Sequence, residues 1–117
     1  MKKSMLICDD EEGIRESLRL IFEKDYDLVF AANGYEAIDI VKKDPVDVAI
    51  MDIKMPRMDG IETMRKLKSL KPGLKILVTS GYKSVDTARE AVAAGASDYM
   101  VKPFDRVEIL KAVQKLS

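Results

Sequence analysis

Short apolar runs alternate along this chain with longer segments in which apolar residues recur every three or four positions. Continuous apolar runs are typical of buried strands, and the three-to-four spacing is typical of amphipathic helices. Regular alternation of the two predicts an α/β domain in which helices cover both faces of a parallel sheet. The predicted strands are residues 4–8, 27–31, 47–51, 75–79 and 98–101.

The helices between these strands are indicated by apolar spacing and by capping residues. The spacing is clearest in three sets: Ile14, Leu18, Ile21 and Phe22; Ile61, Met64 and Leu67; and Val107, Leu110 and Val113. Asn or Asp followed three positions later by Glu is typical of a helix start. This pattern occurs at Asn33/Glu36, Asp59/Glu62 and Asp105/Glu108. Glycine is common just after a helix end, and we expect that role for Gly73 and Gly95.

The apolar content of the runs also predicts the strand order. MLIC, VAIM and ILV are the most uniformly apolar, as expected of strands buried on both faces, whereas DLVFA and DYMV are mixed and fit the edges of a sheet. With right-handed crossovers, the order 2-1-3-4-5 satisfies this distribution. The predicted fold is therefore a doubly wound, five-stranded parallel α/β sheet with five helices, an order similar to that of flavodoxin-like proteins.

Composition narrows the class of protein. The 117 residues suffice for one domain with its own core, which we expect to span residues 1–117. Lys and Arg (20) balance Asp and Glu (20), so net charge favours neither nucleic-acid nor membrane binding. The sequence has one cysteine, Cys8, no histidine and no apolar run long enough to span a membrane. We expect a cytoplasmic protein in which Cys8 is a buried strand residue.

Polar residues gather where the predicted strands end. In a parallel sheet all carboxyl ends lie at one edge, and ligands bind there, where the strand order reverses. The residues that reach this edge are Asp9 and Asp10, Asp52, Thr79 and Ser80, and Lys102. Since the first and third strands are neighbours in the predicted order, we expect the carboxylates to converge.

Converging carboxylates need compensation. Two like charges 4 Å apart repel by roughly 4 kcal/mol at an effective dielectric constant of 20. Either some of the carboxyl groups are protonated or a cation lies among them. An oxygen-only site without Cys or His suits a hard divalent ion, and Mg²⁺ fits best. Lys102 could pair with Asp52 or with an oxyanion attached to Asp52.

Each of these residues also has an ordinary structural interpretation. Asp9 and Glu12 have the spacing of a helix capping box, and a Thr–Ser pair is often a simple turn. A lysine before proline is usually a solvated surface residue. The joint convergence at one sheet edge nevertheless favours a functional site.

Four motifs together resemble the receiver domain of two-component response regulators, including single-domain members of the chemotaxis or sporulation-relay type. They are DDE after the first strand, MDIKMPRMDG around the third strand end, LVTSG at the fourth and YMVKPF at the fifth. The resemblance implies that Asp52 accepts a phosphoryl group from a phosphohistidine on a sensor histidine kinase. It further implies that Asp9, Asp10, Asp52 and the backbone carbonyl of Lys54 hold Mg²⁺.

The same resemblance assigns the switch residues. Thr79 would hydrogen-bond the phosphoryl oxygens, Lys102 would neutralise them, and Tyr99 would be the aromatic switch. From the residues alone, a half-buried structural tyrosine is an equally good interpretation of Tyr99. The resemblance also implies a cis bond between Lys102 and Pro103, which fits a tight turn.

Partners follow from the same assignment. We expect the kinase to contact Ile14, Pro103 and Phe104, which surround the approach to Asp52. The downstream target is unknown and is expected to bind a surface that carries Tyr82, Lys83, Val107 and Lys111 or their neighbours. No direct nucleic-acid or membrane binding is expected of this domain.

The alternative class is an enzyme. An Mg²⁺-dependent aspartyl-phosphate phosphatase or transferase on a similar fold would carry a second acid close after the nucleophile. Here Ile53 and Lys54 follow Asp52 and supply none. A flavin-binding module is a weaker option, because no Ser/Thr/Gly-rich phosphate loop follows the first strand. We therefore expect a protein that catalyses only its own phosphorylation and dephosphorylation.

Overall fold

The computed structural model describes residues 2–53, 59–81 and 85–116, and strands alternate with helices throughout these residues. The strands are β1 (Lys3–Cys8), β2 (Tyr26–Ala31), β3 (Val48–Asp52), β4 (Lys75–Ser80) and β5 (Asp98–Val101). The helices are α1 (Glu12–Phe22), α2 (Gly34–Lys43), α3 (Gly60–Leu70), α4 (Val85–Ala93) and α5 (Arg106–Leu116). Each strand lies within one residue of its predicted bounds at both ends. Lys54, Tyr82 and Lys83, for which roles are expected, lie outside the described residues.

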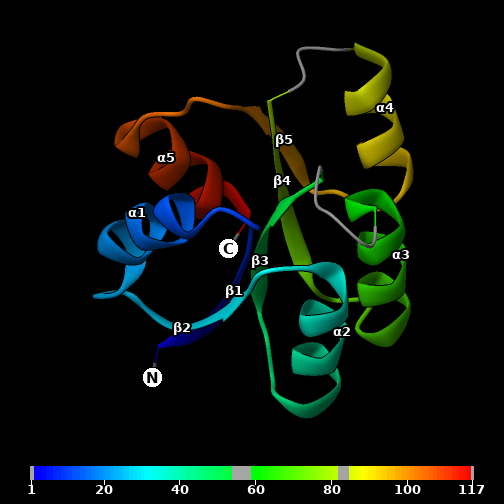
Figure 1. Ribbon diagram of the computed structural model, residues 1–117, viewed down its shortest axis with the longest axis horizontal. Coiled ribbons are helices and arrows are strands. Elements are labelled where there is room, and N and C mark those ends of the chain that lie inside the picture. The colour runs from blue at the N-terminus through cyan, green and yellow to red at the C-terminus, as the bar shows by residue number, and fades with distance from the viewer. Residues whose placement is uncertain (1, 54–58, 82–84, 117) are drawn as a thin grey trace.

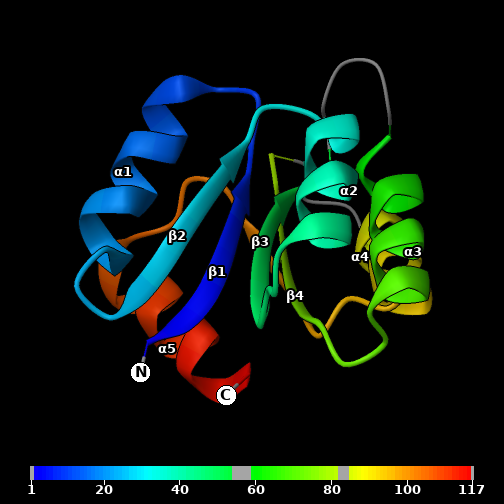
Figure 2. The same cartoon turned by 90° about the horizontal axis from the view of Figure 1, so that it is seen from below.

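The strands form one parallel sheet in the order β2-β1-β3-β4-β5, as predicted. Helices α1 and α5 cover one face, and α2, α3 and α4 cover the other (Figures 1 and 2). Every residue of β3 is buried, β1 is buried from Met5 onwards and β4 from Ile76 onwards, whereas β2 and β5 are mostly half-buried. The prediction of apolar central strands and mixed edge strands is therefore confirmed.

The sheet separates two hydrophobic clusters. Successive strand residues point to opposite faces, so neighbours in the sequence belong to different clusters. Leu6, Met51 and Val78 pack with α2, α3 and α4 in what we call the α2–α4 layer. Ile7, Ile50, Leu77 and, partly buried, Met100 pack with α1 and α5 in what we call the α1/α5 layer.

The predicted helix starts are confirmed by hydrogen bonds. The Asn33 side chain accepts from the Glu36 N–H at 3.0 Å, and the Glu36 carboxylate accepts from the Ala32 N–H at 2.7 Å. Asp59 accepts from the Ile61 N–H at 2.7 Å, so it caps α3. The fifth helix is capped in the same way, because Asp105 accepts from the Glu108 N–H at 2.8 Å. These bonds satisfy N–H groups that have no partner within the helix.

The glycine predictions had opposite outcomes. Gly95 follows α4 with a φ of 114°, its N–H donates to the Val92 carbonyl at 3.1 Å, and the Ala96 N–H donates to the Ala91 carbonyl at 2.9 Å. This is a Schellman helix end, so the prediction for Gly95 is confirmed. The prediction for Gly73 is wrong, because α3 ends at Leu70 with Lys71 as its C-cap. Pro follows Lys71 and cannot continue the helix, so Gly73 lies in the next turn.

Candidate functional site

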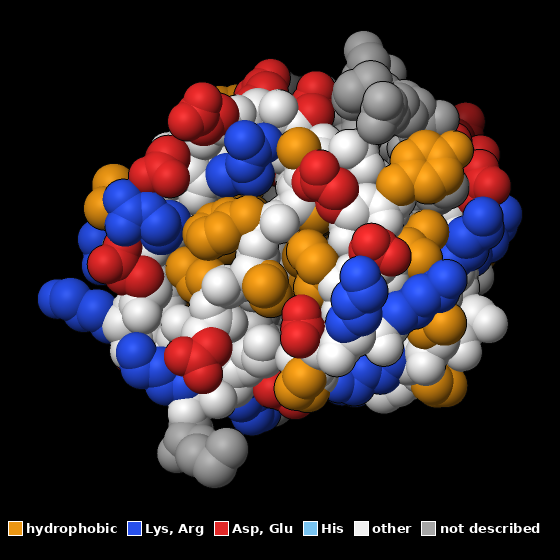
Figure 3. Space-filling view, turned by 60° about the horizontal axis from the view of Figure 1, so that its bottom comes forward, with side chains coloured by type: hydrophobic (Ala, Val, Ile, Leu, Met, Phe, Trp, Pro, Cys, Tyr) orange, Lys and Arg blue, Asp and Glu red, His pale blue; other side chains and the backbone are white. Residues whose placement is uncertain are grey.

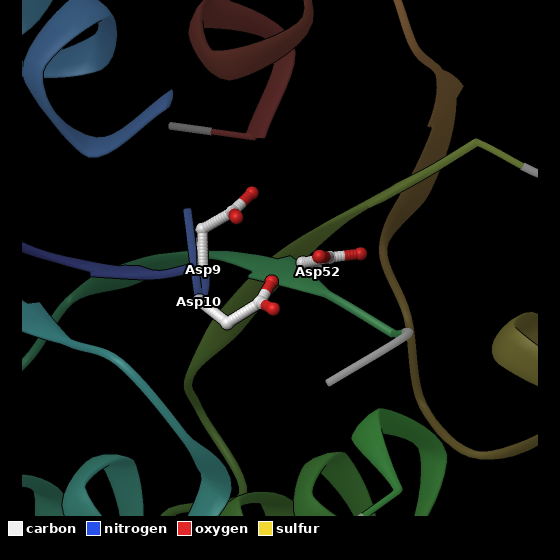
Figure 4. Close-up of side chains that lie close together, drawn as sticks. All are labelled: Asp9, Asp10 and Asp52. Atoms are coloured by element: carbon white, nitrogen blue, oxygen red, sulfur yellow. The ribbon is translucent and has the colours of Figure 1, made fainter. Parts of the chain in front are cut away.

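The three carboxylates predicted at the sheet edge lie together in the structure. One carboxylate oxygen each from Asp9, Asp10 and Asp52 lie within 4.8 Å of one another. Asp9 and Asp10 follow the end of β1, and Asp52 is the last residue of β3, its neighbour in the sheet (Figure 4). Asp9 and Asp52 are 2% and 4% exposed, which puts two negative charges in a nearly dry environment.

Strand alternation explains why four polar side chains meet here. The side chains of Ile7, Ile50, Leu77 and Met100 pack in the α1/α5 layer. The residues two positions after them are Asp9, Asp52, Thr79 and Lys102. Alternation therefore gives all four the same side of the sheet. Pairing of β3 with β4 continues to the end of β3. Asp52 lies opposite Thr79, and the Ile53 N–H donates to the Thr79 carbonyl at 3.2 Å.

Lys102 pairs with two of the carboxylates. Its Nζ lies 2.9 Å from Asp9 Oδ2 and 3.4 Å from Asp52 Oδ2, so the predicted pair with Asp52 exists but Asp9 is nearer. The Lys102 N–H donates to the Ser80 carbonyl at 2.7 Å, and the bond to Pro103 is cis, as the resemblance implied. Burial alone would lower the pKa of the Lys102 ammonium. The hydrogen bond to Asp9 and the charges of Asp52 and Asp9 outweigh burial and raise this pKa.

The turn between β1 and α1 fixes Asp9. The Asp9 carboxylate accepts from the Glu11 N–H at 2.9 Å, and the Asp9 carbonyl accepts from Arg15 Nη1 at 2.8 Å. Glu11 is the N-cap of α1 and makes no side-chain cap hydrogen bond. The capping-box interpretation of Asp9 and Glu12 is therefore wrong, because the chain makes a tight turn at Asp9 before the helix begins. The supporting role of Arg15 has no signal in the sequence beyond its spacing from Asp9.

Cys8 is a buried strand residue, as expected. Burial, followed by the negative charges of Asp9, Asp52 and Glu36, raises the pKa of the Cys8 thiol to about 12. The thiol is therefore protonated at neutral pH, the form in which cysteine is a poor nucleophile and a poor metal ligand. This leaves carboxylate oxygens as the donors of the cluster.

The remaining predicted residues lie around this edge. Thr79 is buried and lies opposite Met100, whereas Tyr99 lies opposite Val78, is half-buried and packs against the α2–α4 layer. Ile14 and Phe104 are partly buried in the α1/α5 layer, and Pro103 is exposed.

Asp9, Asp10 and Asp52 fit a hard divalent cation. They offer oxygen donors only, and such donors suit Mg²⁺, which keeps several waters and takes few protein carboxylates. The half-buried Lys102 ammonium already balances part of the negative charge, so one divalent ion could compensate for the rest.

Comparison with known families decides the identity. The model of the response regulator receiver domain matches residues 5–114. The chain belongs to this family. It is therefore the phospho-accepting module of two-component signal transduction, which receives a phosphoryl group from a histidine kinase phosphohistidine and signals through the resulting conformational change. Among residues 2–53, 59–81 and 85–116, no helix combines the length and apolar character needed to cross a bilayer.

Individual relatives support the assignment of the receiver. This chain is 39% identical to sporulation initiation phosphotransferase F of Bacillus subtilis, over 98% of this chain and 94% of that protein. It is 38% identical to response regulator MprA of Mycolicibacterium vanbaalenii over 99% of this chain, but spans only 51% of MprA. A solved response regulator of Burkholderia pseudomallei, with a phosphorylated aspartic acid, a calcium ion and citrate, is 30% identical with a TM-score of 0.87. That match covers 97% of this chain and 72% of the solved one.

Proposed function

We propose that Asp52 is the residue of this receiver that accepts the phosphoryl group. The observation that carries the proposal is that Asp52 lies beside an ammonium, a hydroxyl residue and a possible cation site. The Lys102 ammonium lies 3.4 Å from its carboxylate, and Thr79 is its partner in the sheet. Asp9 and Asp10 lie beside it and can hold a divalent cation with it.

Asp9 is less suited to the acceptor role. One of its carboxylate oxygens accepts from the Glu11 N–H and the other accepts from Lys102 at 2.9 Å. Both oxygens are therefore engaged by the turn and by the ammonium. We propose that Asp9 and Asp10 instead hold Mg²⁺ with Asp52 and the backbone carbonyl of Lys54, the last of which lies outside the described residues. The calcium ion and phosphorylated aspartic acid of the Burkholderia pseudomallei relative support this pairing of cation and acceptor.

The chemistry is an in-line displacement. An Asp52 carboxylate oxygen attacks the phosphorus of the phosphohistidine; the new O–P bond forms as the N–P bond breaks, and the electron pair stays on the imidazole nitrogen, which takes up a proton. Charge then spreads over the equatorial phosphoryl oxygens. The Lys102 ammonium and the Thr79 hydroxyl can neutralise or hydrogen-bond two of them. A bound Mg²⁺ would supply the remaining charge neutralisation.

We also propose that the kinase docks on the side of α1 and the turn after β5. Ile14 and Phe104 belong to the α1/α5 layer, on whose side of the sheet Asp52 lies, and Pro103 directly follows Lys102. Ile14→Asp should therefore slow transfer from a kinase phosphohistidine far more than labelling by phosphoramidate, which needs no protein contact. Equal slowing of the two reactions would exclude this face.

The acceptor assignment is tested by substitution. Asp52→Asn keeps the size of the side chain but removes the nucleophilic carboxylate, so phosphoramidate should give no stable phosphoprotein by mass spectrometry. Asp25→Asn, in the exposed turn after α1, is the matched control and should label like the original chain. Labelling of a folded Asp52→Asn protein would refute the assignment. Sustained phosphate release from p-nitrophenyl phosphate would instead indicate an enzyme that acts on external substrates.

A further inference from the structure

Helices α2 and α3 lie on the face of the sheet opposite α1 and α5 (Figure 2). Residues of both helices line a groove of about 510 Å³. Its lining residues are Tyr35, Ile38, Asp39, Lys42, Lys66, Ser69 and Leu70. Tyr35 and Leu70 are 56% and 45% exposed, although both are large and hydrophobic. Hydrophobic side chains lie among basic ones over α2 and α3 on the right of Figure 3. The groove is not part of the phosphorylation site.

We propose that this groove docks an amphipathic helix of a partner protein, with acidic residues flanking its apolar stripe. The lining positions on α2 are Tyr35, Ile38, Asp39 and Lys42, which recur at spacings of three and four residues from Tyr35 and Ile38. Such spacing means that one stripe of the helix faces the groove. Leu70 provides an apolar contact on the α3 wall. Two parallel helix stripes with an apolar floor are the geometry into which a third helix packs.

The charges of the groove select an acidic partner. Lys42 lies on the α2 wall and Lys66 on the α3 wall, so a bound helix would have an ammonium on each side. Asp39 is the acidic lining residue, and its pair with Lys43 at 3.7 Å is exposed and worth little, so the lining carries two lysines against one carboxylate. The Lys66–Glu62 pair is exposed and 3.9 Å long, so it is worth little and can be exchanged for a new partner. Glutamate or aspartate flanking the partner's apolar stripe would complement both lysines.

A second copy of this chain fits the groove poorly. A twofold contact places the same surface patch on both sides of the interface. The charged lining residues are two lysines and one aspartate, so two patches of net positive charge would face each other, which is electrostatically unfavourable. The groove also lies on the opposite face of the sheet from the proposed kinase contacts, so a partner there leaves α1 and the turn after β5 uncovered (Figure 1).

The test uses two defined peptides with the full chain. Each has about 18 residues, enough for a few helical turns, with leucines at helical spacing. One carries glutamates beside the leucines and the other carries lysines at the same positions. We expect the acidic peptide to bind at sub-millimolar concentration and to shift amide resonances of α2 and α3. Tyr35→Ala and Leu70→Ser should each weaken binding by about tenfold, as expected for central apolar contacts.

Charge reversal gives the sharper result. Lys42→Glu should weaken binding of the acidic peptide and strengthen binding of the basic one. Lys115→Glu on α5 should change the affinity of neither peptide. Leu20→Ser, which removes an exposed leucine of α1, is the matched control for Leu70→Ser. Three results would overturn the proposal: the acidic peptide does not bind at about 1 mM, both peptides bind equally well, or the amide resonance shifts are confined to α1 and α5. So would a concentration-dependent dimer that Leu70→Ser abolishes. None of these outcomes bears on phosphorylation at Asp52.

Discussion

At the scale of single residues, the site depends on carboxylates that share one ammonium. Lys102 contacts Asp9 at 2.9 Å and Asp52 at 3.4 Å. Asp9 is also a proposed cation ligand, so a cation bound there would compete with Lys102 for its carboxylate. An ammonium displaced from Asp9 would still have Asp52 within reach. The same side chain can thus stabilise the site before and after phosphoryl transfer.

The buried thiol of Cys8 should make stability depend on pH. Its pKa is about 12 in the folded chain and 9.0 ordinarily, so above pH 9 the unfolded chain loses the proton first. The folded state then binds more protons, and the free energy of unfolding falls as pH rises, by up to about 1.4 kcal/mol per pH unit between pH 9 and 12. Denaturant unfolding of the original chain and of Cys8→Ala measures this effect. The difference between them should shrink as pH rises, and a constant difference would contradict the prediction.

At the scale of elements, the junction of β3 and α3 is unusually close. The Gly60 N–H donates to the Ile53 carbonyl at 3.0 Å. A Cβ at residue 60 would lie 2.2 Å from Ile53 Cα and 2.7 Å from the Asp52 carbonyl oxygen. Real atoms do not approach so closely, so any larger residue must move the backbone next to the proposed acceptor.

Gly60→Ala should therefore destabilise the fold by about 1–3 kcal/mol, the usual cost of overpacking, and should slow phosphorylation. Gly13→Ala is the matched control, because nothing lies within 4 Å of a Cβ there and alanine favours helices. Gly13→Ala should leave stability unchanged or raise it by up to about 1 kcal/mol. Thermal unfolding and phosphoramidate labelling measure both effects. A Gly60→Ala protein that matched the control would show that the junction relaxes without strain.

The elements and their order were predictable because local patterns specify them. Apolar runs and cap residues act within a few positions, so the strands, the order of the sheet and the caps at Asn33, Asp59 and Asp105 followed from the sequence. The closer pairing of Lys102 with Asp9 and the fit of Gly60 against Ile53 depend on distances across the fold. Gly73 shows the other limit, since a glycine near a helix end need not be the cap when proline already stops the helix.

At the scale of the whole molecule, the two proposed switch residues belong to different layers. Thr79 lies on the side of the α1/α5 layer and Tyr99 packs in the α2–α4 layer, but they are on adjacent strands. A phosphoryl group that draws Thr79 towards it would shift the conformational equilibrium of β4 and β5. The free energy of this shift is limited by how much more strongly Thr79 hydrogen-bonds in the phosphorylated state, about 1–3 kcal/mol.

Thr79→Ala should therefore permit phosphorylation of Asp52 but uncouple it from α4, β5 and α5. Addition of beryllofluoride and Mg²⁺ should shift the amide resonances of these elements strongly in the original chain and only weakly in Thr79→Ala. Resonances next to Asp52 should respond in both proteins, which confirms that the mimic is bound. A full set of distal shifts in Thr79→Ala would exclude the route through Thr79 and Tyr99.

The end of α4 has a consequence for handedness. Gly95 has a φ of 114°, which L-residues rarely adopt and D-residues favour. At Gly95 the fold therefore prefers a backbone geometry that suits a D-residue better than an L-residue. L-alanine would meet both this strain and the Lys68 side chain, whose Cγ lies 3.0 Å from the Cβ it would add. D-alanine installed by chemical synthesis would instead restrict the unfolded chain to the required geometry, and could add up to about 1 kcal/mol of stability.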